Sequence, residues 1–408
     1  MINLAVIGMG GRASGLLRLA RQLDLPFKLS AIVDPSPDSV RQRLRQRELH
    51  DGLDVPVFAN IDRMLASGAP IDGIIVGTRC NLHAPLAVQL AERGVDVPIL
   101  LEKPVAISEE QLTQLARAYA GRGEKVVVSF PLRVTPLFRK ALEIVQSGRL
   151  GAINQIQAHN NVSYGGVYFG NWYRDFDTTG GLWLQKATHD FDYLNALAGS
   201  APLVVAATHA RRVYGGDMPE NLRCSECDRT ETCVESPQNL KKRRDTGGMP
   251  IDDHLCAFSE SIKNQDAGSA LLMYENGLHA AYSQNFVTRR TAGRRGACVT
   301  GYHATLTFDW RDNIVRVIDH HDEPRITEWP ITTAEDDHGG GDSVLLRNFF
   351  DLIRGEAASH TPLEQGLLSA AMCLAARKSA NTWTFQPIAL PDQPQPASAL
   401  APPQMVEA

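Results

Sequence analysis

The first 130 or so residues alternate short runs of β-branched and other apolar side chains with longer segments whose apolar residues recur at helical spacing. The short runs predict strands at residues 4–7, 29–33, 73–76, 98–101 and 126–129. The longer segments predict helices at residues 13–23, 39–47, 82–93 and 109–119. Asn81 and Ser108 are candidate helix caps, and Gln111 follows Ser108 at the spacing of a capping box. This alternation predicts parallel strands between covering helices.

From residue 131 onward the pattern changes. One helix is predicted at residues 137–146, followed by strands with polar alternation such as residues 154–161. A more apolar strand at residues 269–274 ends in the turn Glu275-Asn276-Gly277. Two long helical patterns follow, at residues 343–354 and 363–380. We expect a mostly antiparallel sheet in this half of the chain.

Composition narrows the class of protein. The chain has 408 residues, of which 43% are hydrophobic, enough to bury two cores. Its 41 Lys and Arg against 46 Asp and Glu give a net charge of −5, and no basic block could follow a phosphate backbone, so nucleic acid is not an expected partner. The opening residues MINLAVIGMGG lack the positive region of a secretion signal, and no apolar stretch approaches the roughly 20 residues of a membrane span. We expect a cytoplasmic protein without a membrane partner.

A glycine-rich turn follows the first predicted strand and leads into a helix. Its residues are Gly8, Met9, Gly10, Gly11 and Arg12. Glycines let the backbone turn tightly and approach a pyrophosphate, whose charge is met by N–H groups at the helix start. Asp34, at the end of the second strand, can accept hydrogen bonds from the ribose hydroxyls of NAD and would repel the 2′-phosphate of NADP. NAD is therefore the predicted cofactor, the alternative being that Asp34 is an exposed turn residue near Arg41.

These patterns predict an α/β protein with two domains. Residues 1–130 are expected to form an NAD-binding Rossmann domain. Residues 131–390 are expected to form a substrate-binding and oligomerisation α+β domain with a large, mostly antiparallel open sheet and a cysteine-containing insertion at about residues 213–256. The stretch 391–408, rich in Pro, Ala and Gln, is expected to be a disordered tail.

Two groups of residues follow later strands of the first domain. One group is Thr78, Asn81 and His83; the other is Glu102, Lys103 and Pro104. Doubly wound sheets bind ligands at the carboxyl ends of their strands. Lys103 could transfer a proton there if burial and a neighbouring cation lower its pKa, the alternative being a surface ion pair with Glu102. For His83 the alternative is a capping or surface residue.

Together these motifs resemble the glucose–fructose oxidoreductase and inositol dehydrogenase (Gfo/Idh/MocA) family. In the first domain the resemblance is carried by Gly8 to Arg12, Asp34, Thr78, Asn81, His83 and Glu102-Lys103-Pro104. In the second domain it continues at residues 180–192, GGLWLQKATHDFD. It extends to about residue 385.

The resemblance implies that NAD is surrounded by the glycine turn, Asp34, Thr78, Asn81, His83 and Glu102. It places Lys103 beside the nicotinamide and the reacting hydroxyl, makes His189 the second catalytic group, and gives Asp192 the task of fixing the His189 tautomer. It also implies a homodimer or homotetramer formed across the open sheet. The sequence departs from the family at Gln185, where many members carry an aspartate four residues before the histidine.

Oxidation of a carbinol needs a base that takes the hydroxyl proton as the hydride leaves for the nicotinamide. Lys103 and His189 can share that task, so we expect an NAD-dependent oxidoreductase that acts on a sugar, polyol or related cyclic hydroxy compound. Because Gln185 cannot titrate, Lys186, Asp190 or water would carry any further proton. Two alternatives stay open: an NAD-dependent glycoside hydrolase or lyase acting through transient oxidation and elimination, and a catalytically silent NAD-binding sensor.

Further candidates for substrate contact share aromatic rings or polar termini. They are Asn160, Tyr164, Trp172, Arg174 and Lys186. Aromatic rings pack on the apolar faces of sugars while amides and guanidinium groups bond hydroxyls, although such residues also serve as core or interface. The arginines at 289, 290, 294 and 295 are expected to form a solvated edge rather than an anion site.

Four of the seven cysteines form a cluster in the sequence. They are Cys224, Cys227, Cys233 and Cys256. A Cys-x2-Cys pair can direct two thiolates at one tetrahedral ion, and a third and fourth sulfur would complete a structural zinc site. Free thiols and labile disulfides are the alternatives. We expect the cluster to hold a loop in place rather than to perform chemistry.

Overall fold

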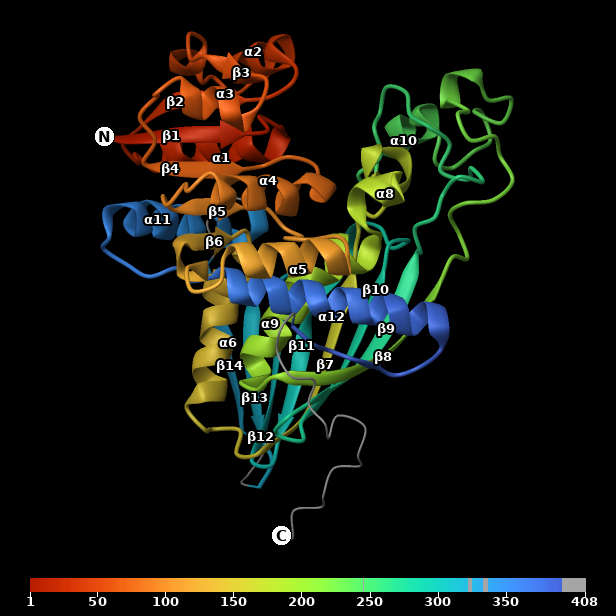
Figure 1. Ribbon diagram of the computed structural model, residues 1–408. Coiled ribbons are helices and arrows are strands. Elements are labelled where there is room, and N and C mark those ends of the chain that lie inside the picture. Colours follow the sequence, from red (N-terminus) through yellow and green to blue (C-terminus); the bar gives the residue numbers. More distant parts are fainter. Residues whose placement is uncertain (245, 322–324, 333–336, 391–408) are drawn as a thin grey trace. The chain divides into compact units, whose positions relative to one another are not determined.

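The computed structural model describes residues 1–244, 246–321, 325–332 and 337–390. The chain forms two compact units (Figure 1). The first comprises Met1–Pro136 with Thr333–Ala371, and the second comprises Leu137–Thr332 with the chain from Met372 onward. The tail expected at 391–408 lies outside the described residues. Within the described ranges, no helix is long and apolar enough to cross a membrane.

The first unit is built on a parallel sheet. Its described strands are β1 (Ile2–Ile7), β2 (Phe27–Val33), β3 (Val57–Phe58), β4 (Gly73–Val76), β5 (Ile99–Leu101) and β6 (Val126–Val128). They lie in the order β3-β2-β1-β4-β5-β6, and every pair is parallel. The order reverses at β1, as in a doubly wound nucleotide-binding sheet. The Rossmann prediction is therefore confirmed.

Helices connect these strands, as the apolar periodicity predicted. They are α1 (Gly11–Gln22), α2 (Pro37–Gln46), α3 (Ile61–Ala66), α4 (Cys80–Glu92) and α5 (Glu109–Ala118). Ser108 caps α5, because its side chain accepts from the Gln111 N–H at 3.2 Å, while Gln111 Oε1 accepts from the Ile107 N–H at 3.0 Å. The cap expected at Asn81 differs, since α4 begins one residue earlier and Arg79 occupies the N-cap.

A helix from late in the chain completes the first unit. α11 (Gly341–Arg354) packs against α1 and β6. Its Phe349 and Phe350 are fully buried in the same apolar core as Phe27 of β2, and the rings of Phe27 and Phe350 meet edge to face at 6.2 Å. The expected boundary at residue 131 assigned this helix to the second domain. Its apolar face instead covers the first sheet, a placement that no local pattern encodes.

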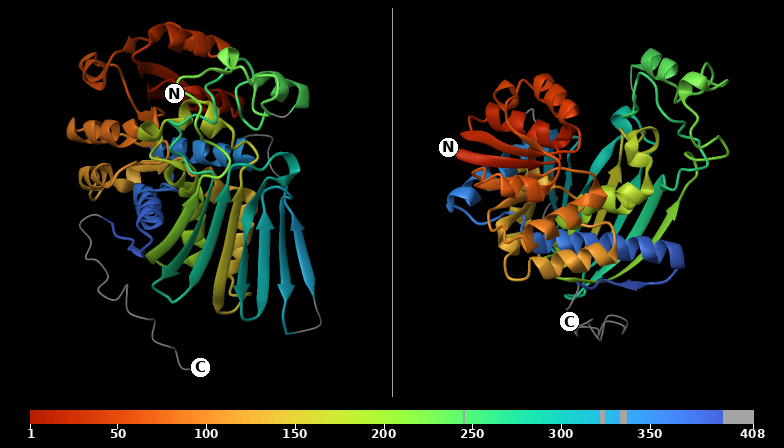
Figure 2. Two further views of the ribbon diagram at one scale, coloured as in Figure 1. Left: turned by 90° about the vertical axis from the view of Figure 1, so that its right-hand side faces the viewer. Right: turned by 45° about the horizontal axis from the view of Figure 1, so that its top comes forward.

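The second unit contains a large mixed sheet (Figure 2). Its described strands are β7 (Ile153–Asn161), β8 (Pro202–Ala210), β9 (Ala267–Tyr274), β10 (His279–Asn285), β11 (Arg294–Gly301), β12 (Ala304–Asp309), β13 (Ile314–Asp319), β14 (Ile326–Pro330) and β15 (Gln386–Pro387). Their order is β14-β13-β12-β11-β7-β10-β9-β8-β15. Among the described strand pairs of this second sheet, only β7–β10 is parallel. The expected mostly antiparallel sheet is confirmed.

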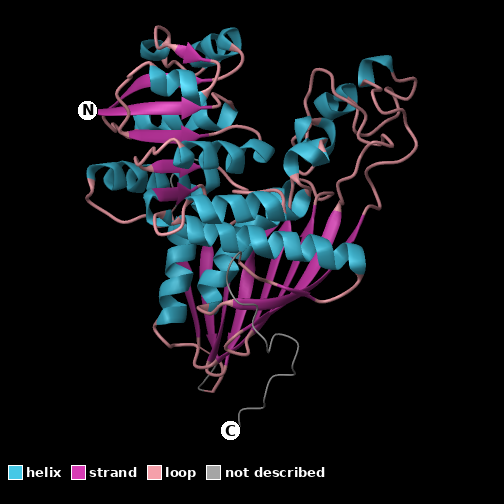
Figure 3. Ribbon diagram, in the orientation of Figure 1, coloured by secondary structure: helices cyan, strands magenta, loops and turns pink. Residues whose placement is uncertain are grey.

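Helices lie over one face of this sheet (Figure 3). The helices of the second unit are α6 (Pro136–Gln146), α7 (Val167–Gly170), α8 (Phe176–Thr179), α9 (Thr188–Ala198), α10 (Pro237–Arg243) and part of α12 (Leu363–Thr382). Phe138 of α6 contacts both Tyr193 of α9 and Phe308 of β12, at 5.8 and 5.9 Å between ring centroids. These rings fix α6 and α9 to the sheet.

The cysteine-containing insertion has little regular structure and packs into an apolar core that it shares with neighbouring segments of the second unit. The stacked rings of Phe169 and Tyr214, 3.9 Å apart, lie in it together with Leu240, Met249 and Phe286. Asp266 closes the insertion, because its carboxylate accepts from three successive backbone N–H groups at residues 212–214. A carboxylate that accepts several backbone N–H bonds is a strong local anchor.

Candidate functional site

The glycine turn of the first unit has the shape that a pyrophosphate requires. Gly8 has φ +82°, and a Cβ placed there would lie 2.5 Å from Thr78 Cγ2. Gly10 is the N-cap of α1, and a Cβ there would approach the Gly77 carbonyl oxygen at 3.2 Å. The first turn of α1 contains no acidic residue that would compete with an anion for its N–H groups. These residues fit a dinucleotide phosphate.

Asp34 lies directly beside this turn. Its Oδ2 accepts from the Met9 N–H at 3.1 Å and its Oδ1 from the Ser36 N–H at 2.9 Å. The two bonds hold the carboxylate at the carboxyl end of β2, next to β1 in the sheet. A carboxylate at this edge can accept from ribose hydroxyls.

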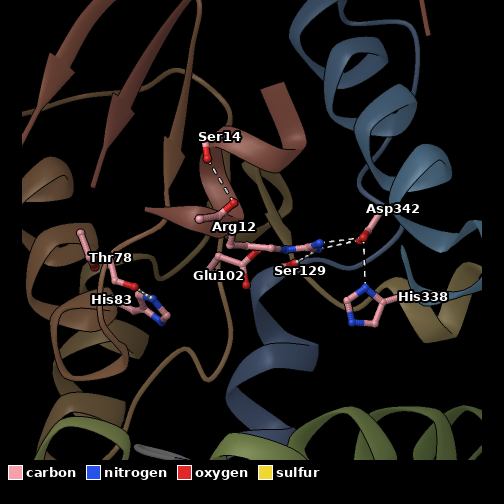
Figure 4. Close-up of polar contacts among 9 residues, drawn as sticks. Arg12, Ser14, Thr78, His83, Glu102, Ser129, His338 and Asp342 are labelled. Atoms are coloured by element: carbon pink, nitrogen blue, oxygen red, sulfur yellow. Dashed lines mark hydrogen bonds and ion pairs between the residues drawn. The ribbon is translucent and has the colours of Figure 1, made fainter. Parts of the chain in front are cut away.

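Arg12, the last residue of the glycine turn, directs its side chain to partners within the first unit. Its guanidinium binds both oxygens of Asp342, at 2.6 Å from Nη1 and 2.5 Å from Nη2, while Nε donates to Glu102 at 2.9 Å (Figure 4). Nη2 also donates to Ser129 Oγ at 3.2 Å. Arg12 therefore joins α1, the end of β5, the end of β6 and α11. The predicted place of Arg12 in the cofactor-binding turn stays a prediction.

Electrostatics keeps this network fully ionised. Burial opposes the charge of Arg12, but Glu102 and Asp342 outweigh burial and raise the pKa of the guanidinium. Burial likewise opposes the charge of both carboxylates, and Arg12 outweighs it, so the pKa values of Glu102 and Asp342 are lowered. His338 adds to the effect at Asp342, since its Nδ1 lies 3.0 Å from Asp342 Oδ2.

His83 connects two of the strand-end loops. Its Nδ1 lies 2.8 Å from the Pro104 carbonyl oxygen and its Nε2 lies 3.2 Å from the Thr78 carbonyl oxygen. Burial lowers the pKa of the imidazole, and a neutral ring can donate through only one nitrogen. The shorter contact favours a proton on Nδ1. His83 thus positions the loop that carries Lys103, and Asn81 contributes to the same region by accepting from Gln111 Nε2 at 2.9 Å through its carbonyl.

Lys103 lies two residues beyond the end of β5, between buried Glu102 and Pro104. Its ammonium is partly buried, close enough to Cys80, His83 and Glu102 to influence the pKa of each. The first unit therefore gathers the glycine turn, Asp34, Thr78, Glu102 and Lys103 at the carboxyl ends of neighbouring strands β2, β1, β4 and β5. This edge is where doubly wound sheets bind dinucleotides.

The second unit carries the histidine predicted to be catalytic. His189 lies in the first turn of α9, which continues from a π-helical turn at Trp183–Ala187. Such turns are frequent at functional sites. Gln185, Lys186 and His189 are each no more than 5% exposed, and Asp192 follows His189 by one helical turn and is 1% exposed.

Asp190, the residue after His189, accepts hydrogen bonds from three strands of the large sheet. Arg295 Nε donates to Asp190 Oδ1 at 2.7 Å, while Asn160 Nδ2 and Tyr282 Oη donate to Oδ2 at 2.8 Å each. These bonds join α9 to β7, β10 and β11. Arg295 was expected on a solvated edge; its side chain is 14% exposed and ion-paired instead. Asn160, a predicted substrate contact, thus holds the Asp190 side chain.

Lys186 contacts Tyr164, which also was a substrate candidate. The Lys186 ammonium donates to the Tyr164 hydroxyl oxygen and lies 4.4 Å from the centre of the same ring. Burial lowers the pKa of Lys186, an effect that Tyr164 opposes and the like charge of Arg295 reinforces. Tyr164 itself is 44% exposed.

Of the two remaining substrate candidates, Arg174 contacts the end of the insertion and Trp172 stacks on its neighbour in the sequence. Arg174 Nη1 donates to the Cys256 carbonyl oxygen at 3.0 Å and Nη2 to Ser261 Oγ at 3.1 Å. Trp172 stacks on Tyr173 with ring centroids 3.8 Å apart. Arg174 is 8% exposed and thus stabilises the insertion.

The cysteine cluster comes together but does not form a metal site. Its four cysteines and His254 line one small cavity. Yet among the described residues no group of three or more His, Cys, Asp or Glu side chains has the arrangement that a metal requires. The zinc hypothesis is not supported.

Comparison with known proteins places this geometry in a family. Residues 2–130 match the NAD-binding Rossmann-fold domain of the Gfo/Idh/MocA oxidoreductase family. Residues 143–390 match the C-terminal α/β domain of the same family. The Bacillus subtilis protein YteT, named as an oxidoreductase, is 25% identical over 86% of this chain and 89% of its own length. Inositol 2-dehydrogenase of Burkholderia ambifaria is 21% identical over 96% of this chain and 98% of its own length.

Solved structures share the fold. Levoglucosan dehydrogenase in complex with NADH and levoglucosan superimposes with a TM-score of 0.72 at 16% identity, over 95% of this chain and 99% of the other. The WlbA dehydrogenase of Bordetella pertussis, in complex with NADH and UDP-GlcNAcA, gives a TM-score of 0.67 at 20% identity, over 95% and 99% of the two chains. At these identities the likeness concerns the fold alone.

Proposed function

Because the chain belongs to the Gfo/Idh/MocA oxidoreductase family, with its NAD-binding Rossmann domain and C-terminal α/β domain, we propose that it transfers a hydride between NAD and a hydroxyl-bearing carbon of a sugar, polyol or related cyclic compound. The relatives named for activity on inositol and levoglucosan support this substrate class. The observation that carries the proposal is the gathering of the glycine turn, Asp34 and Lys103 at one edge of the parallel sheet.

The residues that would hold the cofactor follow from the first unit. At Gly8 and Gly10 the chain after β4 excludes a side chain, because a Cβ would meet Thr78 or the Gly77 carbonyl oxygen. A pyrophosphate would bind the bare backbone of this turn at the start of α1, and Asp34 would accept from the adenosine ribose. Bound NAD supplies the hydride acceptor. His83 and Glu102 act indirectly: His83 orients the Lys103 loop, and Glu102 anchors Arg12.

Proton transfer is the task of Lys103 and His189. As the C–H bond gives up its hydride, the substrate O–H proton passes to one of these two groups, and in the reverse direction it returns to the alkoxide oxygen. Asp192, one turn after His189, would select the tautomer of His189. Gln185 cannot accept a proton, and Asp190 is held by Arg295, so neither adds a step.

A turnover screen tests this proposal. Purified protein is incubated with NAD and a panel of sugars, inositols, anhydrosugars and aryl glycosides, and reduced cofactor is followed by its near-ultraviolet absorbance. We expect NADH to accumulate with at least one hydroxy compound. Glycoside cleavage without net NADH would indicate redox-assisted hydrolysis instead. Tight NADH binding without turnover of any compound would indicate a sensor.

Assembly through the large sheet is part of the proposal. A hollow on this sheet is lined by small residues, among them Ala206, Ala207, Ala270 and Ala281, with Leu271 57% exposed beside them. An exposed apolar sheet face favours association. Analytical ultracentrifugation is expected to show a dimer or tetramer, with Leu271→Asp shifting it toward the monomer.

A further inference from the structure

Lys186 is a buried cation next to the proposed proton-transfer residue His189. It is 5% exposed and lies three residues before His189 on the same continuous helix, so that the two side chains project from one side of it. Its ammonium contacts the hydroxyl and the ring of Tyr164. Burial removes water from the charge of this lysine, so neighbouring acceptors or negative groups must replace the lost hydration.

Asp190 offsets the charge of Lys186 only in part. Asp190 is bound by Arg295 on one oxygen and by Asn160 and Tyr282 on the other. Arg295 is itself a buried cation that repels Lys186. The two cations thus share one carboxylate that is already saturated with donors. Asp192 lies nearly two turns further along α9, on the far side of His189.

Tyr164 connects this buried charge with solvent. The phenol is 44% exposed, whereas Lys186 behind it is buried. A phenol oxygen that accepts from an ammonium can still donate its own proton, and the positive charge makes it a stronger donor. The pair therefore combines a buried ammonium with the phenol of a part-exposed residue, and Lys186 precedes the helix that carries His189.

We propose that Lys186 and Tyr164 bind an anionic group of the substrate, so that the compound handled at this site is an acidic sugar, with a carboxylate such as that of a hexuronate as its recognised group. The location beside a reacting hydroxyl rests on the proposed function. The anion accepts from the Tyr164 hydroxyl and offsets the charge of Lys186. A sugar phosphate offers the same charge with a different geometry, and the test separates the two.

Binding measurements on the full chain saturated with NADH test the proposal without requiring turnover. The ligands are D-glucuronate and D-galacturonate, their neutral counterparts D-glucose and D-galactose, and D-glucose 6-phosphate. We expect each hexuronate to bind at least about tenfold more tightly than its neutral counterpart, the ratio that one charge-assisted hydrogen bond supplies. Added salt should reduce this ratio. If D-glucose 6-phosphate binds more tightly than both hexuronates, the group recognised by the site is a phosphate and not a carboxylate.

Variants connect the preference to the two residues. Lys186→Met is expected to bring hexuronate binding down to the level of the neutral sugar, and Lys186→Arg to retain most of the preference because it keeps the charge. Tyr164→Phe changes a half-exposed residue, tests the hydroxyl alone, and should lower the preference several-fold. NADH binding and the thermal midpoint of each variant report whether it folds.

The outcomes distinguish this inference from the proposed function. Equal binding of acidic and neutral sugars, no binding of any acidic sugar, or a preference that survives both Lys186→Met and Tyr164→Phe would overturn the inference. A hexuronate that binds through Lys186 but is never oxidised would instead count against hydride transfer. Oxidation of a neutral sugar with unchanged rate in both variants would leave the proposed function standing and remove the anion site.

Discussion

Arg12 and Asp342 form a two-pronged ion pair although 330 residues separate them in the sequence. The pair fastens α11, a helix from the end of the chain, to the turn that receives the cofactor in the proposed function. The Asp342 side chain is 2% exposed and that of Arg12 28%. The last part of the chain thus contributes to the first unit through an electrostatic bond as well as through the apolar contacts of Phe349 and Phe350.

Removal of Arg12 should destabilise the first unit. Arg12→Ala leaves the buried carboxylates of Asp342 and Glu102 uncompensated, a loss of about 3 kcal/mol in the free energy of unfolding. Urea denaturation followed by circular dichroism measures it. Arg18→Ala, an exposed position on the same helix, is the matched control and should change stability by no more than about 0.5 kcal/mol. Equal effects of the two variants would show that the network contributes nothing.

The same network predicts how stability depends on pH. Glu102 and Asp342 have lowered pKa values in the folded protein. As the pH falls, these two carboxylates therefore take up protons at a higher pH in the unfolded chain than in the folded one. Their stabilisation is present above the ordinary carboxylate pKa of about 4 and is lost as the pH drops through it toward the folded values. Thermal midpoints between neutral pH and about pH 3 should therefore fall more steeply for the wild type than for Asp342→Asn. Parallel curves would contradict this account.

Gly8 should be required both for folding of the turn and for cofactor binding. Gly8→Ala places a Cβ 2.5 Å from Thr78 Cγ2 at a φ of +82°. We expect a loss of roughly 1–3 kcal/mol of stability and a weakening of NADH binding by at least about tenfold, measured by fluorescence titration. Gly94→Ala has a similar φ of +72° but no neighbour within 4 Å, so it reports backbone strain alone. NADH affinity should be unchanged in Gly94→Ala.

Asp34 should set the preference for NADH over NADPH. Its carboxylate lies at the end of β2 beside the Met9 N–H, where a 2′-phosphate would be repelled. Asp34→Ser is expected to narrow the ratio of the two dissociation constants by roughly tenfold. Asp38→Ser, an exposed acid on α2, controls for a general change in charge. If both variants shift the ratio alike, Asp34 has no special role.

Local patterns in the sequence located most strands of the first unit, but only two strands, at residues 154–161 and 269–274, of the large sheet of the second unit. β-branched runs located five of the strands in the parallel sheet, and Ser108 with Gln111 correctly marked the start of α5. β3, with only Val57 and Phe58, is too short to produce a period. The position of α11 depends on partners far away in the chain, which no window of sequence contains.

The candidate site also contains residues that local sequence patterns predict and residues that only the folded chain brings together. The glycine turn, Asp34 and the Lys103 loop follow from residue type and position after a strand. Asp342 has no such signal, because only the folded chain brings it to Arg12. Arg295 likewise appeared to belong to a charged edge, and its pairing with Asp190 across 105 residues depends on the register of β11 against β7. Four cysteines at chelating spacing predicted a metal site that their folded arrangement does not provide.

The central claim is that Lys103 takes part in proton transfer during hydride transfer. Lys103→Met keeps a long, unbranched side chain and removes its titratable group. With a substrate found in the turnover screen, this variant is expected to lower kcat/KM by at least about a hundredfold while the dissociation constant of NADH stays within about twofold of the wild type. Wild-type turnover in Lys103→Met, with NADH bound equally well, would contradict the account.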